Sequence, residues 1–503
     1  MPTQRRPVWQ QRLEIVVAYQ APVLWAIGIA LLAPLVLAFW DSRGLPPRLE
    51  TVSFLLPALL AIVLGLAIRL RRPSPASLSQ TEALLATTAA WLTASVIGAL
   101  PFILLLDIPL IESVFETVSG FTTAGTTMLV HLDTLPRSIL LWRSLTQWLG
   151  GLGILVIILL VGQSRGSQAL SLLNAEGVKV NSGRLSLNFQ RATVKFLQIY
   201  VVLTVVQAVI TLLLGMPLFD AVNHAMTTVA TGGFSPHDES LAFYANRPSQ
   251  FPNHVAMEVV ITVFMLAGGI NFFIHYRLVR RREFRALWDG LEMRILWAVL
   301  AATTVIVALV SWRSIGGSLS DWALRSGFAI ASLISTTGYE ITPTGEFPRL
   351  AREIFLLLMI LGGTAGSTAG GFKLIRAGML GKLLSFEVRK LRLPPHAVHP
   401  PAIDGKAINE VAFRQAVFIL LLWLGYIALG GLAISLMAPE LQIADAYSIV
   451  FSAIGVYGPS FVPVPVVIAL PGVAKAILIV GMLAGRLEIL PLLVFFNLEA
   501  WRR

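Results

Sequence analysis

Long apolar segments recur along the whole chain of 503 residues, and they constrain its fold more than any other feature. A helix of about 20 apolar residues is long enough to cross ~30 Å of hydrocarbon. Only 13% of the residues are charged, about half of the ~25% that is typical of soluble domains. The pattern predicts an all-α integral membrane protein with ten crossings, near residues 17–39, 51–70, 83–106, 138–162, 194–215, 254–276, 293–311, 352–376, 414–437 and 472–497.

The charged residues are divided unevenly between the two predicted sides of the membrane. With the N-terminus inside, the inner segments are 1–14, 69–72, 165–195, 277–294, 373–414 and 502–503. The inner side then carries a net charge of about +17 and the outer side about −6, which gives the total of +11. Cytoplasmic loops of membrane proteins are enriched in Lys and Arg. Topology therefore explains the positive charge, with both termini cytoplasmic, and no nucleic-acid partner is expected.

Four shorter apolar stretches, near 110–128, 218–236, 321–341 and 443–462, are rich in Gly, Thr and Ser. They are too short to span, and they predict re-entrant loops, which are tolerated at membrane depth only where they line a cavity. Their loops read GFTTAGTTM (120–128), TVATGGFSP (228–236), LISTTGYEI (333–341) and AIGVYGPSF (453–461). Each loop has a glycine two residues after a Thr or Val, and each follows an apolar segment that suits a short half-helix.

The unit of span, half-helix, glycine loop and span therefore occurs four times. Two spans and a re-entrant loop return the chain to its starting side, so the four repeats run parallel and can surround one pore. The predicted division is an N-terminal helix pair at 1–72 and pore repeats at 83–165, 194–285, 293–392 and 410–503. Backbone carbonyls that converge on an axis can replace the water shell of a cation, and glycine permits the backbone conformation that turns them inward. Close helix packing by small residues explains one such motif better than four at matching positions.

The eighth predicted span contains the glycine-rich segment GGTAGSTAGGFK at 362–373. Each glycine costs a helix about 1 kcal/mol relative to alanine, so the helix should break near mid-membrane and form an unwound loop. The alternative is that the glycines only permit a tight helix crossing. Arg486 lies in the last predicted span, where a charge usually marks function, and its five donors could bind loop carbonyls. Lys373 could repel cations, but it is expected to extend to the inner interface.

With these motifs laid out, the sequence resembles the Trk/Ktr/HKT superfamily of potassium uptake proteins, most closely the bacterial Trk membrane subunits. The resemblance covers the glycine loops together with QWLGGLGILV (147–156), TGGFSPHD (231–238), GGTAGSTAGGFK (362–373) and GRLEILPLL (485–493). The N-terminal helix pair of that family matches the spans at 17–39 and 51–70. Two departures are Ala124, in TTAG where TTTG is commoner, and Val456, where Asn is common.

The resemblance implies specific roles for residues of this chain. The implied potassium-selective filter consists of Thr122, Thr123, Gly125, Thr231, Gly232, Gly233, Thr336, Thr337, Gly338, Val456, Tyr457 and Gly458. The implied gate consists of Gly362, Gly363, Gly366, Ser367, Thr368, Gly370, Gly371, Lys373 and Arg486. Potassium is then the transported ion and the metal bound at the filter, and no covalent or nucleotide cofactor is expected in this chain.

The resemblance also implies a homodimer in the bacterial cytoplasmic (inner) membrane and cytosolic Rossmann-type nucleotide-binding regulatory subunits. Candidate docking residues are Arg280, Arg281, Arg282, Arg389, Lys390 and Arg392. The alternatives are a sodium- or proton-coupled potassium symporter and a sodium-permeable member of the superfamily. An intramembrane enzyme would need convergent catalytic groups, and only Arg486 and Glu488 are candidates within the predicted spans.

Several outer polar residues are expected to have ordinary roles. The acidic residues near the half-helices could concentrate cations but are expected to be solvated loop charges, and these are Glu112, Glu116, Asp220, Asp238, Glu340 and Asp445. His224 is expected to be a packed polar side chain rather than a metal ligand. The chain has no cysteine, which excludes disulfides, thiolate metal sites and cysteine nucleophiles.

Overall fold

The computed structural model describes residues 7–40, 47–71, 78–163, 185–392, 401–408 and 410–502 of the chain. Most of the predicted inner segment 165–195 and the predicted boundaries at 1, 72, 165 and 503 lie outside the described residues. The described chain is almost entirely helical, as predicted. Its one sheet, within that part, is a two-stranded antiparallel hairpin of β1 (Ala402–Ile403) and β2 (Lys406–Ala407).

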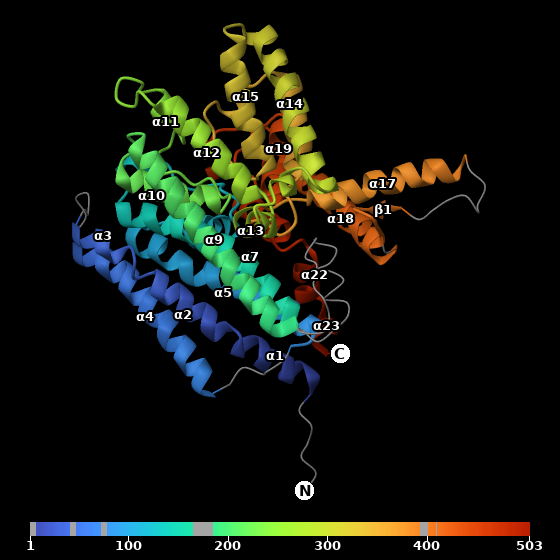
Figure 1. The fold of residues 1–503 in the computed structure, drawn as a ribbon. Helices are drawn as coiled ribbons and strands as arrows, with labels where there is room; N and C mark the ends of the chain where they lie inside the picture. Colours follow the sequence, from blue (N-terminus) through green and yellow to red (C-terminus); the bar gives the residue numbers. More distant parts are fainter. Residues whose placement is uncertain are drawn as a thin grey trace.

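The N-terminal helices form a group along one side of the molecule (Figure 1). They are α1 (Val8–Ala18), α2 (Gln20–Ala30), α3 (Leu35–Trp40) and α4 (Pro47–Arg71). Helices α2 and α4 lie side by side. Glycines permit this close approach, since a Cβ on Gly28 would lie 2.7 Å from Cγ1 of Ile62. The predicted helix pair is therefore present, with its first span divided into short helical segments.

The same order of elements then occurs four times, as a long helix, a short pore helix, a non-helical loop and a second helix. Repeat one has α5 (Gln80–Leu106), α6 (Leu110–Thr122) and α7 (Arg137–Gln163). Repeat two has α9 (Leu185–Leu213), α10 (Leu218–Val229), α12 (His254–Gly269) and α13 (Phe272–Arg281). Repeat three has α14 (Leu291–Ile315), α15 (Leu319–Ile334), α16 (Arg349–Ile360) and α17 (Leu374–Lys390). Repeat four has α18 (Glu410–Met437), α19 (Ile443–Gly455), α21 (Gly472–Arg486), α22 (Leu490–Phe496) and α23 (Leu498–Arg502).

Short helical turns occupy the connections between these elements. They are η1 (Leu132–Thr134), α11 (Ala242–Ala245), η2 (Phe284–Leu287), η3 (Thr344–Glu346) and α20 (Val464–Ile468). Local sequence sets several helix starts. Ser79 and Glu82 form a reciprocal capping box at the start of α5, and Pro109 and Pro217 directly precede the pore helices α6 and α10.

Besides the first span, three of the ten predicted spans are interrupted helices, at 254–276, 352–376 and 472–497. The break in 352–376 was predicted from its glycines, whereas the other two were not. Among the described residues, six helical stretches are long and apolar enough to cross a membrane, with α1 to α3 counted as one stretch, Val8–Ala38. The pair α12 and α13, bent by 105°, would make a seventh. The bend follows Gly269, where the side chain of Asn271 caps the new helix by accepting a hydrogen bond from Phe273 N at 2.8 Å. Helix α16 ends at Ile360, before the glycine-rich segment. Helix α21 ends at Arg486, followed by positive φ angles at Glu488 and Ile489.

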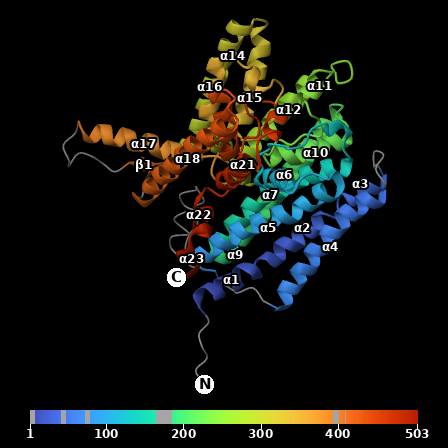
Figure 2. The same ribbon diagram turned by 180° about the vertical axis from the view of Figure 1, so that it is seen from behind.

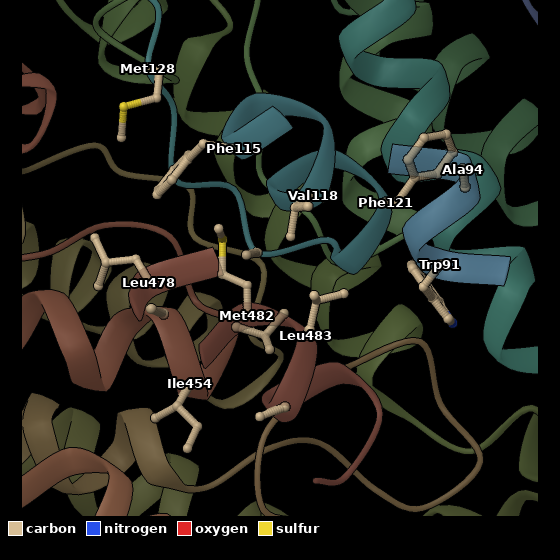
Figure 3. Close-up of a cluster of buried hydrophobic side chains, with 14 of the residues drawn as sticks. Trp91, Ala94, Phe115, Val118, Phe121, Met128, Ile454, Leu478, Met482 and Leu483 are labelled. Atoms are coloured by element: carbon tan, nitrogen blue, oxygen red, sulfur yellow. The ribbon is translucent and has the colours of Figure 1, made fainter. Parts of the chain in front are cut away.

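A cluster of buried apolar side chains joins the first repeat to the last. Helix α6 contacts α21, and Figure 2 shows the two close together from behind. The labelled members in Figure 3 are Trp91, Ala94, Phe115, Val118, Phe121, Met128, Ile454, Leu478, Met482 and Leu483. Because lipid tails are as apolar as these side chains, close van der Waals packing rather than exclusion of water holds such a contact together in a membrane. The cluster closes the four repeats into a ring.

Glycines in the second helices let them touch the ends of the pore helices. A Cβ on Gly150 of α7 would lie 1.9 Å from the carbonyl oxygen of Phe121 in α6. A Cβ on Gly485 of α21 would lie at the same distance, 1.9 Å, from the carbonyl oxygen of Ile454 in α19. Neither position can accept a side chain unless the backbone shifts, so these glycines set how closely each second helix approaches its own pore helix.

We expect Gly150→Ala to destabilise the fold, because overpacking against a backbone atom typically costs ~1–3 kcal/mol. Thermal unfolding of the detergent-purified protein should show a lower Tm. The matched control is Gly425→Ala, since nothing lies within 4 Å of a Cβ at that helical position, and alanine there should leave the Tm unchanged or slightly raised. Equal Tm values for the two variants would contradict the close contact.

Candidate functional site

The four predicted loops share one backbone conformation. In each, a Thr or Val has a positive φ, the next residue does not, and the glycine after it again does. The φ pairs are 58° and 82° (Thr123, Gly125), 54° and 77° (Thr231, Gly233), 55° and 83° (Thr336, Gly338), and 57° and 103° (Val456, Gly458). A positive φ costs an L-residue roughly 1–2 kcal/mol and is most unusual for a β-branched side chain. The recurrence of this conformation at four matching positions indicates a requirement of the site.

The four loops form a closed ring through their glycines. A Cβ on Gly125 would lie 2.3 Å from the carbonyl oxygen of Gly232, and one on Gly233 would lie 1.9 Å from that of Thr337. A Cβ on Gly338 would lie 2.0 Å from the carbonyl oxygen of Tyr457, and one on Gly458 would lie 2.6 Å from that of Ala124. Each glycine therefore adjoins the residue that precedes the glycine of the next repeat, and the fourth loop returns to the first.

The structure brings together nearly all of the residues predicted for the filter. Thr122 is the exception, because it belongs to the helix and not to the loop. It is the last residue of α6, and its hydroxyl donates to Val118 O of the same helix at 2.6 Å. Pore helices α6, α10, α15 and α19 each end within two residues of the ring. The C-terminal end of a helix carries partial negative charge. Backbone carbonyls and four helix ends at one point suit a cation.

A buried ion pair joins loop one to loop two. The Nε of Arg143 lies 2.7 Å from Oε1 of Glu116, and both side chains are buried. Arg143 also donates to the Ser235 carbonyl at 3.0 Å and to the Thr127 hydroxyl at 3.1 Å. The expectation that Glu116 is a solvated charge is wrong. Arg143 was missed, although a charge within the predicted span 138–162 is itself a signal of function.

The segment between α16 and α17 is an unwound loop, residues 361–373, that lies against the ring. Its two ends pair with each other, since Gly362 N donates to Phe372 O and Phe372 N to Ile360 O, both at 2.9 Å. Gly370 N donates to the hydroxyl of Thr336 at 2.8 Å. A Cβ on Gly370 would lie 2.6 Å from Cβ of Val456. The loop therefore touches residues of repeats three and four that were predicted for the filter.

The loop also completes the bend after α12. Thr364 N donates to the Gly269 carbonyl at 3.0 Å, and Thr368 N donates to the Gly268 carbonyl at 3.2 Å. The hydroxyl of Thr368 reaches the Val229 carbonyl at the end of pore helix α10, at 2.9 Å. Backbone groups freed where α12 ends are therefore satisfied by the loop, as the interior of a membrane requires.

Arg486, at the end of α21, also binds the loop. Its buried guanidinium donates to the Thr368 carbonyl, the predicted kind of contact, and to the Gly150 carbonyl at 3.0 Å. Glu488 pairs with Arg376 of α17. Lys373 does not extend to the interface as expected, because its side chain is buried and donates to the Ala369 carbonyl. The other gate candidates, Gly362, Gly363, Gly366, Ser367, Thr368, Gly370 and Gly371, all lie in the loop.

On the outer side, His237 joins two carboxylates. Its ring nitrogens contact Asp133 and, at 3.1 Å, Asp220. Burial alone would lower the pKa of His237, but the hydrogen bonds to Asp220 and Asp133 raise it above its ordinary value. Asp220 is buried, so the expectation of a solvated charge is wrong there too.

The remaining polar residues of the outer side vary in exposure. Asp238 is exposed as expected, whereas Glu112 pairs with Lys475 at 2.6 Å. Glu340 accepts a hydrogen bond from Thr344 N at 2.6 Å, and Asp445 is half-buried. His224 is the packed polar side chain that was predicted, because it is fully buried and its Nδ1 lies 3.2 Å from the Tyr339 hydroxyl.

Comparison with known proteins agrees with this architecture. Residues 57–501 match the family model TrkH, described as cation transport protein. The Trk system potassium uptake protein TrkI of Halomonas elongata is 32% identical over 96% of this chain and 96% of its own length. The Trk system potassium uptake protein TrkH of Salmonella typhimurium is 31% identical over 86% of this chain and 88% of its own.

A solved structure has the same fold over nearly the full length of both chains. The crystal structure of the potassium transporter TrkH from Vibrio parahaemolyticus superposes with a TM-score of 0.83, at 26% identity, and covers 97% of this chain and 100% of that one. The helix order, the four loops and the extent of these matches lead to one conclusion. The chain belongs to the TrkH family of cation transport proteins.

Proposed function

We propose that this chain mediates potassium-selective uptake across the bacterial cytoplasmic membrane through a four-repeat pore. The observation that carries the proposal is the closed ring of four glycine loops, in which each glycine adjoins a carbonyl of the next loop. Such a ring can replace the hydration shell of a cation without a buried countercharge. The names of the relatives supply potassium as the ion. Gly125 also supports potassium, because some plant members of the superfamily with serine at the first filter position favour sodium.

In this proposal the loop at 361–373 is the gate. It lies against the inner residues of the filter loops, Thr336 and Val456 among them. Arg486 ties it to α7, because one guanidinium binds a loop carbonyl and an α7 carbonyl. Opening the path requires these hydrogen bonds to exchange for others, so the closed state is favoured until another interaction displaces the loop.

The proposed setting is the bacterial cytoplasmic membrane, with regulatory partners on its cytosolic side. Both termini are cytoplasmic, and potassium is bound only as the transported ion. Two copies of the chain form a homodimer, and cytosolic Rossmann-type nucleotide-binding subunits regulate it. The basic groups at Arg280–Arg282 on α13 and after it, and at Arg389, Lys390 and Arg392 around the end of α17, are the proposed docking residues.

Selectivity is tested by flux in liposomes that carry either a potassium or a sodium gradient. We expect the wild type to pass potassium faster than sodium. Gly338→Ser should lose most of this preference, because a Cβ there meets the Tyr457 carbonyl at 2.0 Å. The control is Gly316→Ser, which has a similar positive φ of 86° but nothing within 4 Å. Equal potassium and sodium flux in the wild type would refute the selective filter.

The gate is tested by removing the arginine that binds it. We expect Arg486→Ala to raise potassium flux several-fold, since losing a charge-assisted hydrogen bond of about 1.5–3 kcal/mol favours displacement of the loop. Lys475→Ala is the matched control, because Lys475 is a buried cation on the same helix that binds Glu112 instead of the loop. Unchanged or lower flux in folded Arg486→Ala would count against the gate.

A further inference from the structure

The side-chain amide of Gln147, on α7 of repeat one, binds the filter backbone of repeat two. Its Nε2 donates to the Gly232 carbonyl at 2.7 Å, and its Oε1 accepts from Phe234 N at 3.0 Å. Gln147 is fully buried. A Cβ on Gly232 would lie 2.4 Å from Cδ of Gln147, so glycine is required for this approach. The amide therefore bridges the peptide groups on either side of the filter residue Gly233.

Helix α7 makes a second contact with the same loop. Arg143, one turn before Gln147, donates to the Ser235 carbonyl at 3.0 Å, and its guanidinium lies 4.2 Å from the centre of the Phe234 ring. Loop three is held differently, by Ser332 of its own pore helix, which binds Gly338 N at 3.0 Å and Tyr339 O at 2.9 Å. Loop two is thus positioned by side chains of a neighbouring repeat as well as by its own pore helix, where Gly232 N donates to the Thr227 carbonyl at 2.8 Å.

This contact makes the ring chemically asymmetric. The carbonyls that adjoin the four filter glycines belong to Ala124, Gly232, Thr337 and Tyr457. Within the described part of the chain, only the Gly232 carbonyl of these four accepts a hydrogen bond from a protein donor. A donor at 2.7 Å fixes the direction of that carbonyl and withdraws part of its negative potential. Both effects oppose tight closure around a small cation, because selectivity depends on the rigidity and field strength of the coordinating carbonyls.

We propose that Gln147 is a positioning residue that sets the potassium-to-sodium permeability ratio through its hydrogen bond to the Gly232 carbonyl. The inference rests on the proposed function, since it requires a potassium-selective ring. A side chain of repeat one then controls part of the selectivity that the loop of repeat two contributes. The permeability ratio should depend on the donor Nε2–H more than on the shape of the side chain.

The test measures potassium and sodium flux of the full chain in liposomes, for the wild type and two variants. Gln147→Leu removes the donor and the acceptor, and we expect the ratio to fall about fivefold, the factor that one ordinary hydrogen bond supplies. Gln147→Glu keeps the shape. Burial favours the neutral form of this carboxyl group, and Arg143, one turn away on α7, is already paired with Glu116. Only the protonated form can donate to Gly232. The ratio of Gln147→Glu, taken relative to the wild type at the same pH, should therefore rise as the pH falls from about 8 to about 5. This comparison cancels any effect of His237, which also titrates near the same loop.

Gln207 supplies the matched controls. It is also fully buried, but its Nε2 donates at 2.8 Å to the hydroxyl of Thr228 in the pore helix rather than to the filter loop. Gln207→Leu and Gln207→Glu should keep the wild-type ratio at every pH, even if the amount of folded protein falls. If Gln147→Leu does not fold, the pH profile of Gln147→Glu alone tests the role of the Gln147 hydrogen bond.

Each outcome separates this inference from the proposed function. A selective wild type with an unchanged ratio in Gln147→Leu, or a pH-independent ratio in Gln147→Glu, overturns the role of Gln147 and leaves the filter intact. A ratio that falls equally in the Gln207 variants also overturns it, because the effect would then be general loosening. A wild type without any preference for potassium overturns the proposed function and this inference with it.

Discussion

The structure depends on direct backbone contact between the four glycine loops. At each of the four positions a side chain would collide with a carbonyl of the next repeat, so the loops can approach only because glycine has no Cβ and accepts a positive φ. The helices around them follow from this requirement. The second helices carry Gly150 and Gly485 where they meet the pore helices, and Arg143 and Glu116 neutralise each other behind the ring.

Unwound backbone inside a membrane requires partners for its polar groups, because lipid offers none. The break after α12 and the loop at 361–373 satisfy this requirement together, through Thr364 and Thr368 on one side and Gly268 and Gly269 on the other. Arg486 adds donors from a third element. The loop is therefore part of the hydrogen-bonded structure that supports the ring. A displacement of the loop must break hydrogen bonds that also hold residues of the ring, such as the one to Thr336.

Local sequence patterns predicted the fold class, the four loops and the glycine-rich break, because each depends on residues close together in the chain. The Thr-x-Gly spacing of loops one to three, and Val456-x-Gly458, specify a backbone conformation directly. The patterns did not predict that α21 ends at Arg486, that α12 bends at Asn271, or that Glu116 and Asp220 are buried. The contact of Gln147 with Gly232 joins residues 85 positions apart, and its register depends on how two repeats pack. Arg143 could have been found from its position within an apolar span.

The closure of the ring has a consequence for how the protein is made. The hydroxyl of Thr126 in loop one donates to the Gly458 carbonyl in loop four, across 332 positions of sequence. The ring therefore cannot close during synthesis until the last repeat has been inserted. Until then, one side of the ring formed by the first three loops stays uncovered. Contacts at such separation form slowly, and exposed partly assembled surfaces favour misassembly. The apolar cluster between α5, α6 and α21 in Figure 3 is then the seam at which assembly of the protein is completed.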